Sequence, residues 1–331
     1  MICSVLGSPA GSTEARVLLT PREAHTLAER GATVLVEGGV GRDAGFSDHA
    51  YESAGARIVQ RDEALRRGGI ALSAARPLAS ELAVMPEGTA LLGLLHVGVN
   101  SRDLSEAAEG AGVRLVSLDQ VTNAAGRQPF RERMASIAGA LCAPMAARLL
   151  ETGTSRGVLL GGVPGVPPAA VVIVGAGVLG RAAARAFSGL GASVTVLDTR
   201  LEPLEALSRE LPRVITALSG PAMLSRAAVW ADVLVGAVHE AGEPTPQVLG
   251  PRQGKPGSVW LDMAVDEGGC LEGSRPVAGP EDAYYDSGVL CCPIPNMASR
   301  VARTASHVLS GLVAPPLRAA LAGTPIEEAL R

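Results

Sequence analysis

Three glycines, Gly175, Gly177 and Gly180, are spaced as GxGxxG between the apolar run AVVIV and the helical pattern RAAARAF. At this spacing the first glycine permits a tight turn, the second lets a diphosphate approach the backbone, and the third lets the helix pack close to the strand. The backbone N–H groups at the start of such a helix, here at Val178 and Leu179, point at the phosphates. The segment therefore predicts a dinucleotide-binding site.

A carboxylate follows the glycines at the position where the ribose of a dinucleotide would lie. The apolar run SVTVLD ends in Asp198, roughly 20 residues after the glycines. A carboxylate there accepts hydrogen bonds from the ribose hydroxyls and repels a 2′-phosphate, so the cofactor predicted is NAD(H) rather than NADP(H). Arg200, just after Asp198, is the one neighbouring residue that would weaken this preference.

Alternating apolar and amphipathic segments define the elements that must position these residues. In the first part of the chain, strands are predicted at 32–39, 89–99 and 113–121, with helices over TPREAHTLAERG and SRDLSEAAEGAG. Thr20 is the expected N-cap of the first of these helices, with proline in its first turn. This order of strand, helix and strand predicts a parallel sheet.

A long helix is expected at about 132–151, with a kink at Pro144, and a second series of strands follows in AAVVIVGAG, SVTVLD, ADVLVGAV and SVWLDMAV. The fold predicted is α/β, with two doubly wound, Rossmann-like domains, a cleft between them and long helices linking them. The expected substrate (catalytic) domain is 1–130, completed by a C-terminal helix at 306–331. The expected NAD(H)-binding domain is 131–305.

The composition argues against several other classes of protein. The 331 residues are 47 % hydrophobic and 19 % charged, with a net charge of −4. This is too apolar for a disordered chain and has no basic stripe for nucleic acid. No apolar run reaches the roughly 20 residues of a membrane span, and the start MICSVLGSPAGS does not resemble a signal peptide. The five cysteines have no metal-ligand spacing. We expect a cytoplasmic protein with no metal, membrane or nucleic acid as partner.

Longer motifs resemble those of the alanine dehydrogenase / proton-translocating transhydrogenase N-terminal family. The stretch GVLLGGVPGVPPA before the glycines carries more of this resemblance than the glycines themselves. Further matches are RVLLTPREAHTLAERGATVLVEGGVGRDAGFSDHAYESAGARIV, LLHVG, LDMAVDEGGCLEG and NMASRVARTAS, so that the resemblance covers about nine-tenths of the chain. It implies an NAD-dependent oxidoreductase. In alanine dehydrogenases the reaction is the reversible reductive amination of a 2-oxo acid.

The resemblance also implies roles for residues outside the glycine loop. Arg16 matches the arginine that binds the substrate carboxylate, a task suited to a charged, fork-shaped guanidinium. His96 matches the acid–base histidine, and Asp266 matches the aspartate beside nicotinamide and substrate. Asn296 and Met297 match the segment that closes over the nicotinamide. Taken singly, each has a structural alternative: a solvated arginine, a structural histidine, or an aspartate that caps a turn.

The substrate side departs from the family pattern. Ala75 stands where the family has a substrate-contacting lysine, in the stretch GIALSAARPLASEL, and Arg76 follows as the candidate substrate-binding replacement. Adjacent residues of a strand face opposite sides, so Arg76 would point away from the side that the lysine occupies in the family. Lys255, the only lysine, matches a different family lysine. Ala135 stands where a serine is usual, and the chain ends at Arg331, before the closing segment of typical members.

These departures predict an altered substrate. We expect an NAD(H)-dependent oxidoreductase acting on a C–N bond of an amino acid, a 2-oxo acid or a derived imine, because a protonated iminium already carries the activation that a lost cation would supply. One alternative is a non-catalytic NAD(H)-binding sensor, which has no use for Arg16, His96 and Asp266 together. Another is a transhydrogenase-type subunit. The resemblance implies a homo-oligomer, with the helix near 132–151 as interface. The missing closing segment favours a dimer over the larger assemblies of the family.

Overall fold

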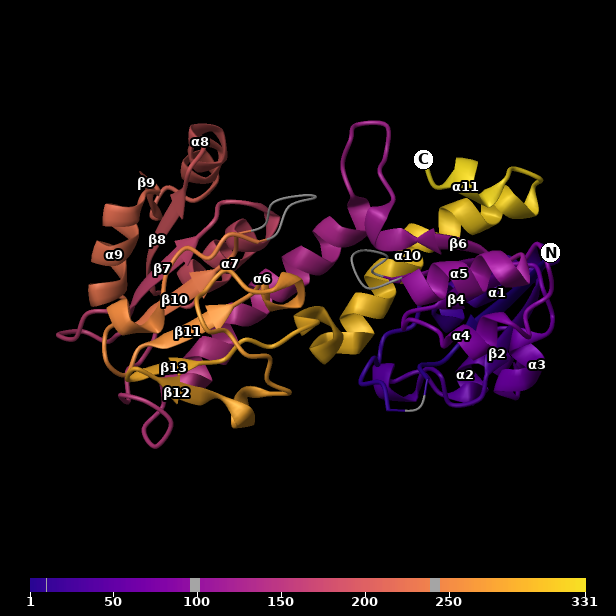
Figure 1. The fold of residues 1–331 in the computed structure, drawn as a ribbon, viewed down its shortest axis with the longest axis horizontal. Helices are drawn as coiled ribbons and strands as arrows, with labels where there is room; N and C mark the ends of the chain where they lie inside the picture. Colours follow the sequence, from indigo (N-terminus) through magenta and orange to yellow (C-terminus); the bar gives the residue numbers. More distant parts are fainter. Residues whose placement is uncertain (10, 96–101, 239–244) are drawn as a thin grey trace. The chain divides into compact units, whose positions relative to one another are not determined.

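Two compact units make up the chain, whose computed structural model is drawn in Figure 1. The structure describes residues 1–9, 11–95, 102–238 and 245–331. The first unit contains Met1–Met134 and Ser299–Arg331, and the second contains Ala135–Ala298. The chain enters the second unit within helix α6 (Pro129–Leu149) and leaves it within the 3-10 helix η6 (Met297–Val301). Both boundaries fall inside helices, so no change in composition marks a linker there. The domain boundaries expected from the sequence differ from these by a few residues.

The first unit is built on a six-stranded parallel sheet with the order β3-β2-β1-β4-β5-β6. Its strands are β1 (Ile2–Leu6), β2 (Thr33–Glu37), β3 (Arg57–Val59), β4 (Ile70–Ser73), β5 (Ala90–Gly93) and β6 (Arg114–Ser117). The intervening helices are α1 (Pro21–Glu29), α2 (Asp48–Ser53), α3 (Arg61–Leu65), α4 (Ala79–Leu82) and α5 (Arg102–Ala111). The strand order reverses between β1 and β4, and ligands of such sheets bind at the carboxyl ends of the strands beside this reversal.

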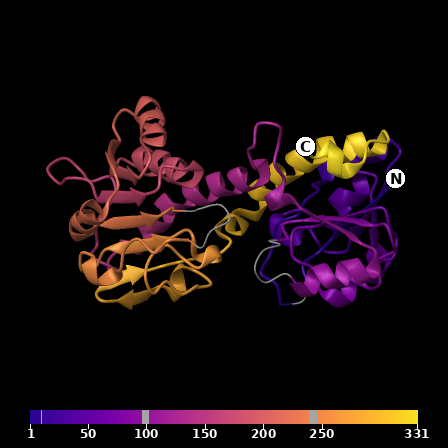
Figure 2. The ribbon, with the colours of Figure 1, turned by 45° about the horizontal axis from the view of Figure 1, so that its top comes forward.

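The C-terminal part of the chain completes the first unit. Helix α10 (Ala302–Leu321) packs against α1 and is followed by α11 (Ile326–Ala329) (Figure 2). Leu309, Val313 and Leu317 recur every four residues on one face of α10 and are fully buried in the core of this unit. Their burial anchors the end of the chain to the sheet built by its beginning.

The second unit has a seven-stranded sheet with the order β12-β13-β11-β10-β7-β8-β9. Its strands are β7 (Ala170–Val174), β8 (Ser193–Asp198), β9 (Ile215–Leu218), β10 (Val233–Gly236), β11 (Val259–Asp262), β12 (Tyr284–Asp286) and β13 (Val289–Cys291). All pair in parallel except β12, which is antiparallel to β13. The other helices are α7 (Val178–Gly189), α8 (Leu201–Glu210) and α9 (Pro221–Trp230). The predicted pair of doubly wound, Rossmann-like units is confirmed, and β9, β12 and β13 add to the predicted strands.

One local detail differs from the expectations. Helix α1 begins after Thr20, but the Thr20 hydroxyl does not cap it: the side chain lies 3.2 Å from the Ser310 hydroxyl on α10. Helix α6 has 21 residues and includes Pro144, where the sequence predicts a kink. None of the helices in the described part of the chain has the length and hydropathy of a membrane-spanning segment.

Candidate active site

The glycine loop joins β7 to α7 and is shaped by two close backbone approaches. Gly175 has φ of +111°, and a Cβ added there would lie 2.4 Å from the carbonyl oxygen of Ala237. A Cβ on Gly180 would lie 1.8 Å from the carbonyl oxygen of Gly175. At Gly177, by contrast, no atom of the described residues comes within 4 Å of the Cβ position. The loop is therefore closed on its protein side and open where a diphosphate approaches.

Asp198, at the end of β8, holds this loop as well as facing the predicted ribose position. Its Oδ2 accepts a hydrogen bond from the backbone N–H of Ala176 at 2.7 Å, and its Oδ1 accepts one from the backbone N–H of Arg200 at 2.8 Å. Each carboxylate oxygen has a further lone pair for a ribose hydroxyl. The Arg200 side chain is 72 % exposed, with Nε 3.7 Å from Oδ1. The residues present thus fit an adenosine ribose and its diphosphate.

The first unit has a similar acidic position but no nucleotide loop. Glu37 ends β2, and its Oε2 accepts from the backbone N–H of Gly7 at 2.6 Å. The guanidinium of Arg61 donates to that same oxygen at 2.8 Å and to Glu81 Oε1 at 2.7 Å. Arg61 therefore neutralises the carboxylate that would meet a ribose, and the segment after β1 reads GSPAGS without a GxGxxG spacing. The residues present therefore fit the predicted dinucleotide site in the second unit and not in the first.

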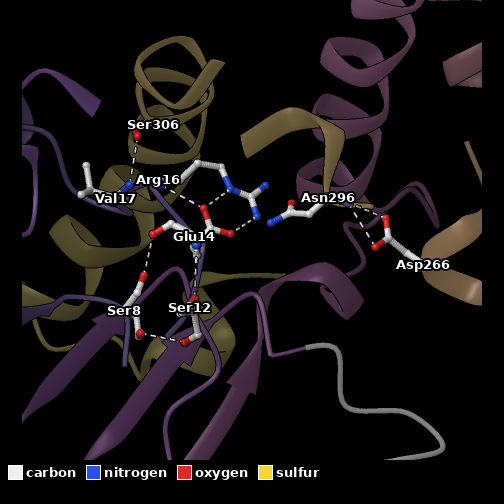
Figure 3. Close-up of polar contacts among 10 residues, drawn as sticks. Ser8, Ser12, Glu14, Arg16, Val17, Asp266, Asn296 and Ser306 are labelled. Carbon is white, nitrogen blue, oxygen red and sulfur yellow. Dashed lines mark hydrogen bonds and ion pairs between the residues drawn. The ribbon is translucent and has the colours of Figure 1, made fainter. Parts of the chain in front are cut away.

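Arg16 lies in the first unit, in the segment between β1 and α1. Its side chain is 3 % exposed and is paired with Glu14, whose side chain is 7 % exposed (Figure 3). Arg16 Nε donates to Glu14 Oε1 at 2.8 Å and Nη2 donates to Oε2 at 2.5 Å. A guanidinium presents a second donor edge between Nη1 and Nη2. Within the described ranges no residue accepts a hydrogen bond from Nη1, so that edge remains available to a carboxylate.

Hydrogen bonds from neighbouring hydroxyl groups shape the segment around Arg16. The Ser8 hydroxyl donates to the Glu14 carbonyl oxygen at 2.7 Å, and the Ser12 hydroxyl accepts from the Glu14 N–H at 3.2 Å. The backbone N–H of Val17 donates to Ser306 on α10 at 2.9 Å. Figure 3 shows these contacts around the ion pair. The sequence prediction named Arg16 and missed Glu14 and Ser306; the Glu-x-Arg spacing was the available signal for Glu14.

The position predicted to match the family lysine is buried and uncharged. Ala75 follows β4 and is 8 % exposed, and its carbonyl oxygen accepts a hydrogen bond from the Ser73 hydroxyl at 2.7 Å. Arg76, the predicted substitute for the lysine, donates from Nη2 to Asp103 Oδ1 on α5 at 2.6 Å. This ion pair engages one nitrogen of the Arg76 guanidinium, and the predicted contact of Arg76 with substrate stays a prediction. His96 follows β5, the neighbour of β4, but lies outside the described residues.

In the second unit the structure brings Asp266 and Asn296 together. Asp266 lies in the 3-10 helix η4 (Val265–Glu267), and both its carboxylate oxygens accept from the backbone N–H of Asn296, at 3.1 and 2.9 Å. Asn296 has φ of +48°, a conformation that non-glycine residues seldom adopt and that clusters at functional sites. The adjacent Met297 is buried. Asp266 therefore fixes the turn predicted to face the nicotinamide.

A second aspartate, Asp262, organises the chain around Asp266 and was not predicted from the sequence. Asp262 ends β11 and is 1 % exposed. Its carboxylate accepts from the backbone N–H groups of Ala264 and Leu271 at 3.0 and 2.9 Å and from the Ser274 hydroxyl at 2.6 Å. These bonds close the loop that follows the strand. The signal in the sequence was an aspartate at a strand end before the glycine-rich stretch DEGGCLEG.

The cysteines and the single lysine belong to the scaffold. Burial raises the pKa of the Cys3, Cys142 and Cys291 thiols to about 12. Burial, assisted by the negative charge of Asp262, also raises the pKa of Cys270. These four thiols stay protonated near neutral pH and supply no thiolate nucleophile. Lys255 Nζ donates to Asp232 Oδ1 at 2.6 Å, which ties the turn before β11 to the turn before β10.

The doubly wound units and the glycine loop at the carboxyl end of β7 define a dinucleotide-dependent α/β protein, and comparison with known proteins narrows this class. The model of the alanine dehydrogenase/PNT N-terminal domain matches residues 10–138, and that of the C-terminal domain matches residues 142–331. The chain belongs to the alanine dehydrogenase/PNT family, and its cofactor is NAD(H).

Individual relatives agree with this assignment. Alanine dehydrogenase of Mycobacterium tuberculosis strain H37Rv is 36 % identical over 312 residues, which cover 92 % of this chain and 83 % of the relative. Alanine dehydrogenase of Bacillus subtilis is 34 % identical, covering 92 % and 82 %. A solved structure of an L-alanine dehydrogenase, 34 % identical, matches all of this chain and 93 % of its own with a TM-score of 0.92. The protein is an oxidoreductase of the alanine dehydrogenase/PNT type.

Proposed function

We propose that the protein is an NAD(H)-dependent amino-acid dehydrogenase or imine reductase that acts on a C–N bond of a substrate other than alanine. The observation that supports this most is the buried Arg16, whose Glu14 pair leaves one donor edge for a substrate carboxylate. The reaction type is inferred from the relatives, which are alanine dehydrogenases. The buried Ala75 is the reason for proposing a different substrate.

Each site residue has a distinct task in this proposal. Bound NAD(H) supplies or accepts a hydride, and it is held by the Gly175–Gly180 loop and Asp198. Arg16 binds the substrate carboxylate through its open donor edge, which fixes the carbon that reacts. His96 gives or takes the proton that accompanies the change at nitrogen or oxygen. Asp266 positions the Asn296 turn through its two hydrogen bonds.

The side chains near the aligned lysine position favour an imine. Ala74 and Ala75 are buried, and Arg76 is engaged by Asp103. A 2-oxo acid would lack the cation that polarises its carbonyl group at this position. A protonated imine carries a positive charge on its own nitrogen and needs no such cation. The methyl side chain of Ala75 is also much smaller than a lysine side chain, which suits a bulkier substrate.

Turnover of NADH with a carbonyl or imine substrate is the expected result that tests this function. NADH oxidation is followed at 340 nm with ammonium plus pyruvate, 2-oxobutyrate, 2-oxovalerate or phenylpyruvate, and with cyclic imino acids. We expect at least one substrate to be reduced, and we expect His96→Ala to lower that rate by about 10²- to 10⁴-fold while NADH still binds. Unchanged turnover in His96→Ala would remove this residue from the mechanism.

Ala75→Lys tests the proposed change of substrate. We expect the new amine to raise turnover of pyruvate with ammonium by at least about tenfold, since a cation beside the carbonyl group stabilises developing negative charge. Ala74→Lys, one residue earlier, is the matched control and should give no such gain. The loss of the lysine is not the determinant of specificity if neither variant gains pyruvate activity.

A non-catalytic NAD(H) sensor is the second candidate, supported by the missing lysine. Tight NADH binding without turnover of any substrate in the panel would favour it. We further propose that the protein works in the cytoplasm, in line with its five free cysteines, and as a homo-oligomer, with a dimer favoured and α6 as the candidate interface. Sedimentation equilibrium tests the dimer directly.

A further inference from the structure

Two serines of the C-terminal helix hold the backbone that follows Arg16. Ser306 Oγ accepts from the backbone N–H of Val17 at 2.9 Å, and Ser310 Oγ accepts from the backbone N–H of Thr20 at 2.9 Å. The two serines are one helical turn apart on α10 and are 0 % and 1 % exposed. They are 289 and 290 residues from their partners in the sequence.

These two bonds satisfy buried backbone N–H groups. The residues between Arg16 and α1 are buried but belong to no helix or strand, so the N–H groups of Val17 and Thr20 find no partner in a helix or a sheet. A buried N–H without an acceptor costs about 1–3 kcal/mol. The two serine hydroxyls of α10 supply the acceptors. The backbone of this segment is therefore fixed by α10 rather than by its own secondary structure.

Only one of the two serines acts next to the candidate substrate-binding arginine. Ser306 bonds the residue directly after Arg16, whereas Ser310 bonds the N-cap of α1, three residues further on. Glu14 holds one edge of the guanidinium from the other side along the chain. Between them, Glu14 restrains the side chain of Arg16 and Ser306 restrains its backbone, so the direction of the open Nη1–Nη2 edge is set from both ends.

We propose that Ser306 is a positioning residue for the substrate carboxylate, acting through Arg16. The inference rests on the proposed function, in which Arg16 binds that carboxylate. Loss of the Ser306 hydroxyl frees the Val17 N–H and lets the segment shift. A displacement near 1 Å at a carboxylate clamp is enough to weaken a two-bond contact severely. Helix α10 thus contributes to substrate recognition without a residue that touches substrate.

The test compares Ser306→Ala with Ser310→Ala, because both remove one buried acceptor from α10. Calorimetry gives the Kd of NADH and the Kd of pyruvate for the NADH complex, and thermal unfolding gives the Tm. We expect both variants to lose stability to a similar extent and to bind NADH normally. Ser306→Ala should weaken pyruvate binding about tenfold, and Ser310→Ala less than about threefold. Ser306→Cys, which keeps the side-chain shape, replaces Ser306→Ala if that variant does not fold.

A double-mutant cycle separates positioning from general damage. Arg16→Lys should itself weaken pyruvate binding, and adding Ser306→Ala to it should cost little more, because the group being positioned is already gone. Equal losses of pyruvate affinity in Ser306→Ala and Ser310→Ala would overturn the inference. So would a full additional loss of pyruvate affinity when Ser306→Ala is added to Arg16→Lys. If the wild-type NADH complex binds neither pyruvate nor any other acid of the NADH-oxidation panel, or Arg16→Lys leaves the Kd unchanged, the carboxylate site of the proposed function fails and the inference fails with it.

Discussion

Gly177→Ala is expected to weaken NADH binding by about 10- to 100-fold without lowering the Tm. Gly177 has φ of −68° and ψ of −169°, which alanine adopts without strain, and no atom of the described chain lies within 4 Å of the added Cβ. The methyl group would instead occupy the space through which the diphosphate reaches the backbone N–H groups of α7. Calorimetric titration with NADH and thermal unfolding measure the two quantities.

Two other glycines of the same helix and loop serve as controls. Gly189, at the end of α7, also has an open Cβ position, so Gly189→Ala should leave NADH binding unchanged. Gly180→Ala should lower both the Tm and the affinity, because its Cβ would lie 1.8 Å from a backbone oxygen that cannot turn away. Normal NADH affinity in Gly177→Ala would show that the diphosphate does not approach the loop at this point.

Glu14→Ala is expected to destabilise the first unit by about 3–5 kcal/mol. The variant leaves the guanidinium of Arg16 buried without its carboxylate partner, and the desolvation of a buried charge is then uncompensated. Chemical unfolding followed by far-UV circular dichroism measures the loss. Surface ion pairs such as Arg66–Asp62, in which both side chains are more than half exposed, contribute at most about 1 kcal/mol, so Asp62→Ala is the matched control.

Replacing both partners distinguishes the burial of charge from the loss of packing. In Glu14→Leu/Arg16→Met no charge remains buried, and we expect most of the lost stability to return. The double variant should not bind pyruvate, since the open donor edge is removed. If Glu14→Ala lowers the free energy of unfolding by less than about 1 kcal/mol, water reaches the ion pair and Glu14 does not hold Arg16.

Sequence patterns of short range were sufficient for the scaffold and for the cofactor. The glycine spacing, the apolar strands and Asp198 act within about 30 residues of one another, and one βαβ unit positions them all. The parallel sheets followed from the alternation of strands and helices. The family resemblance was confirmed by both family models. The antiparallel strand β12 was not predicted, because an edge strand of three residues is too short to show a clear pattern of apolar residues.

The amino-acid sequence alone thus determined the fold class, the NAD(H) loop and the identity of Arg16 and Asp266 as candidate site residues, because these depend on local spacing and on matched motifs. The tertiary structure decided what each of these side chains contacts. Arg16 is paired with Glu14, its backbone is held from α10, and Asp266 bonds the N–H of Asn296. The Arg16–Glu14 pair is local, two residues apart, whereas the Val17–Ser306 and Asn296–Asp266 bonds span 289 and 30 residues. Partners at such separations are chosen by packing, because a buried donor bonds whichever acceptor the folded core brings within about 3 Å.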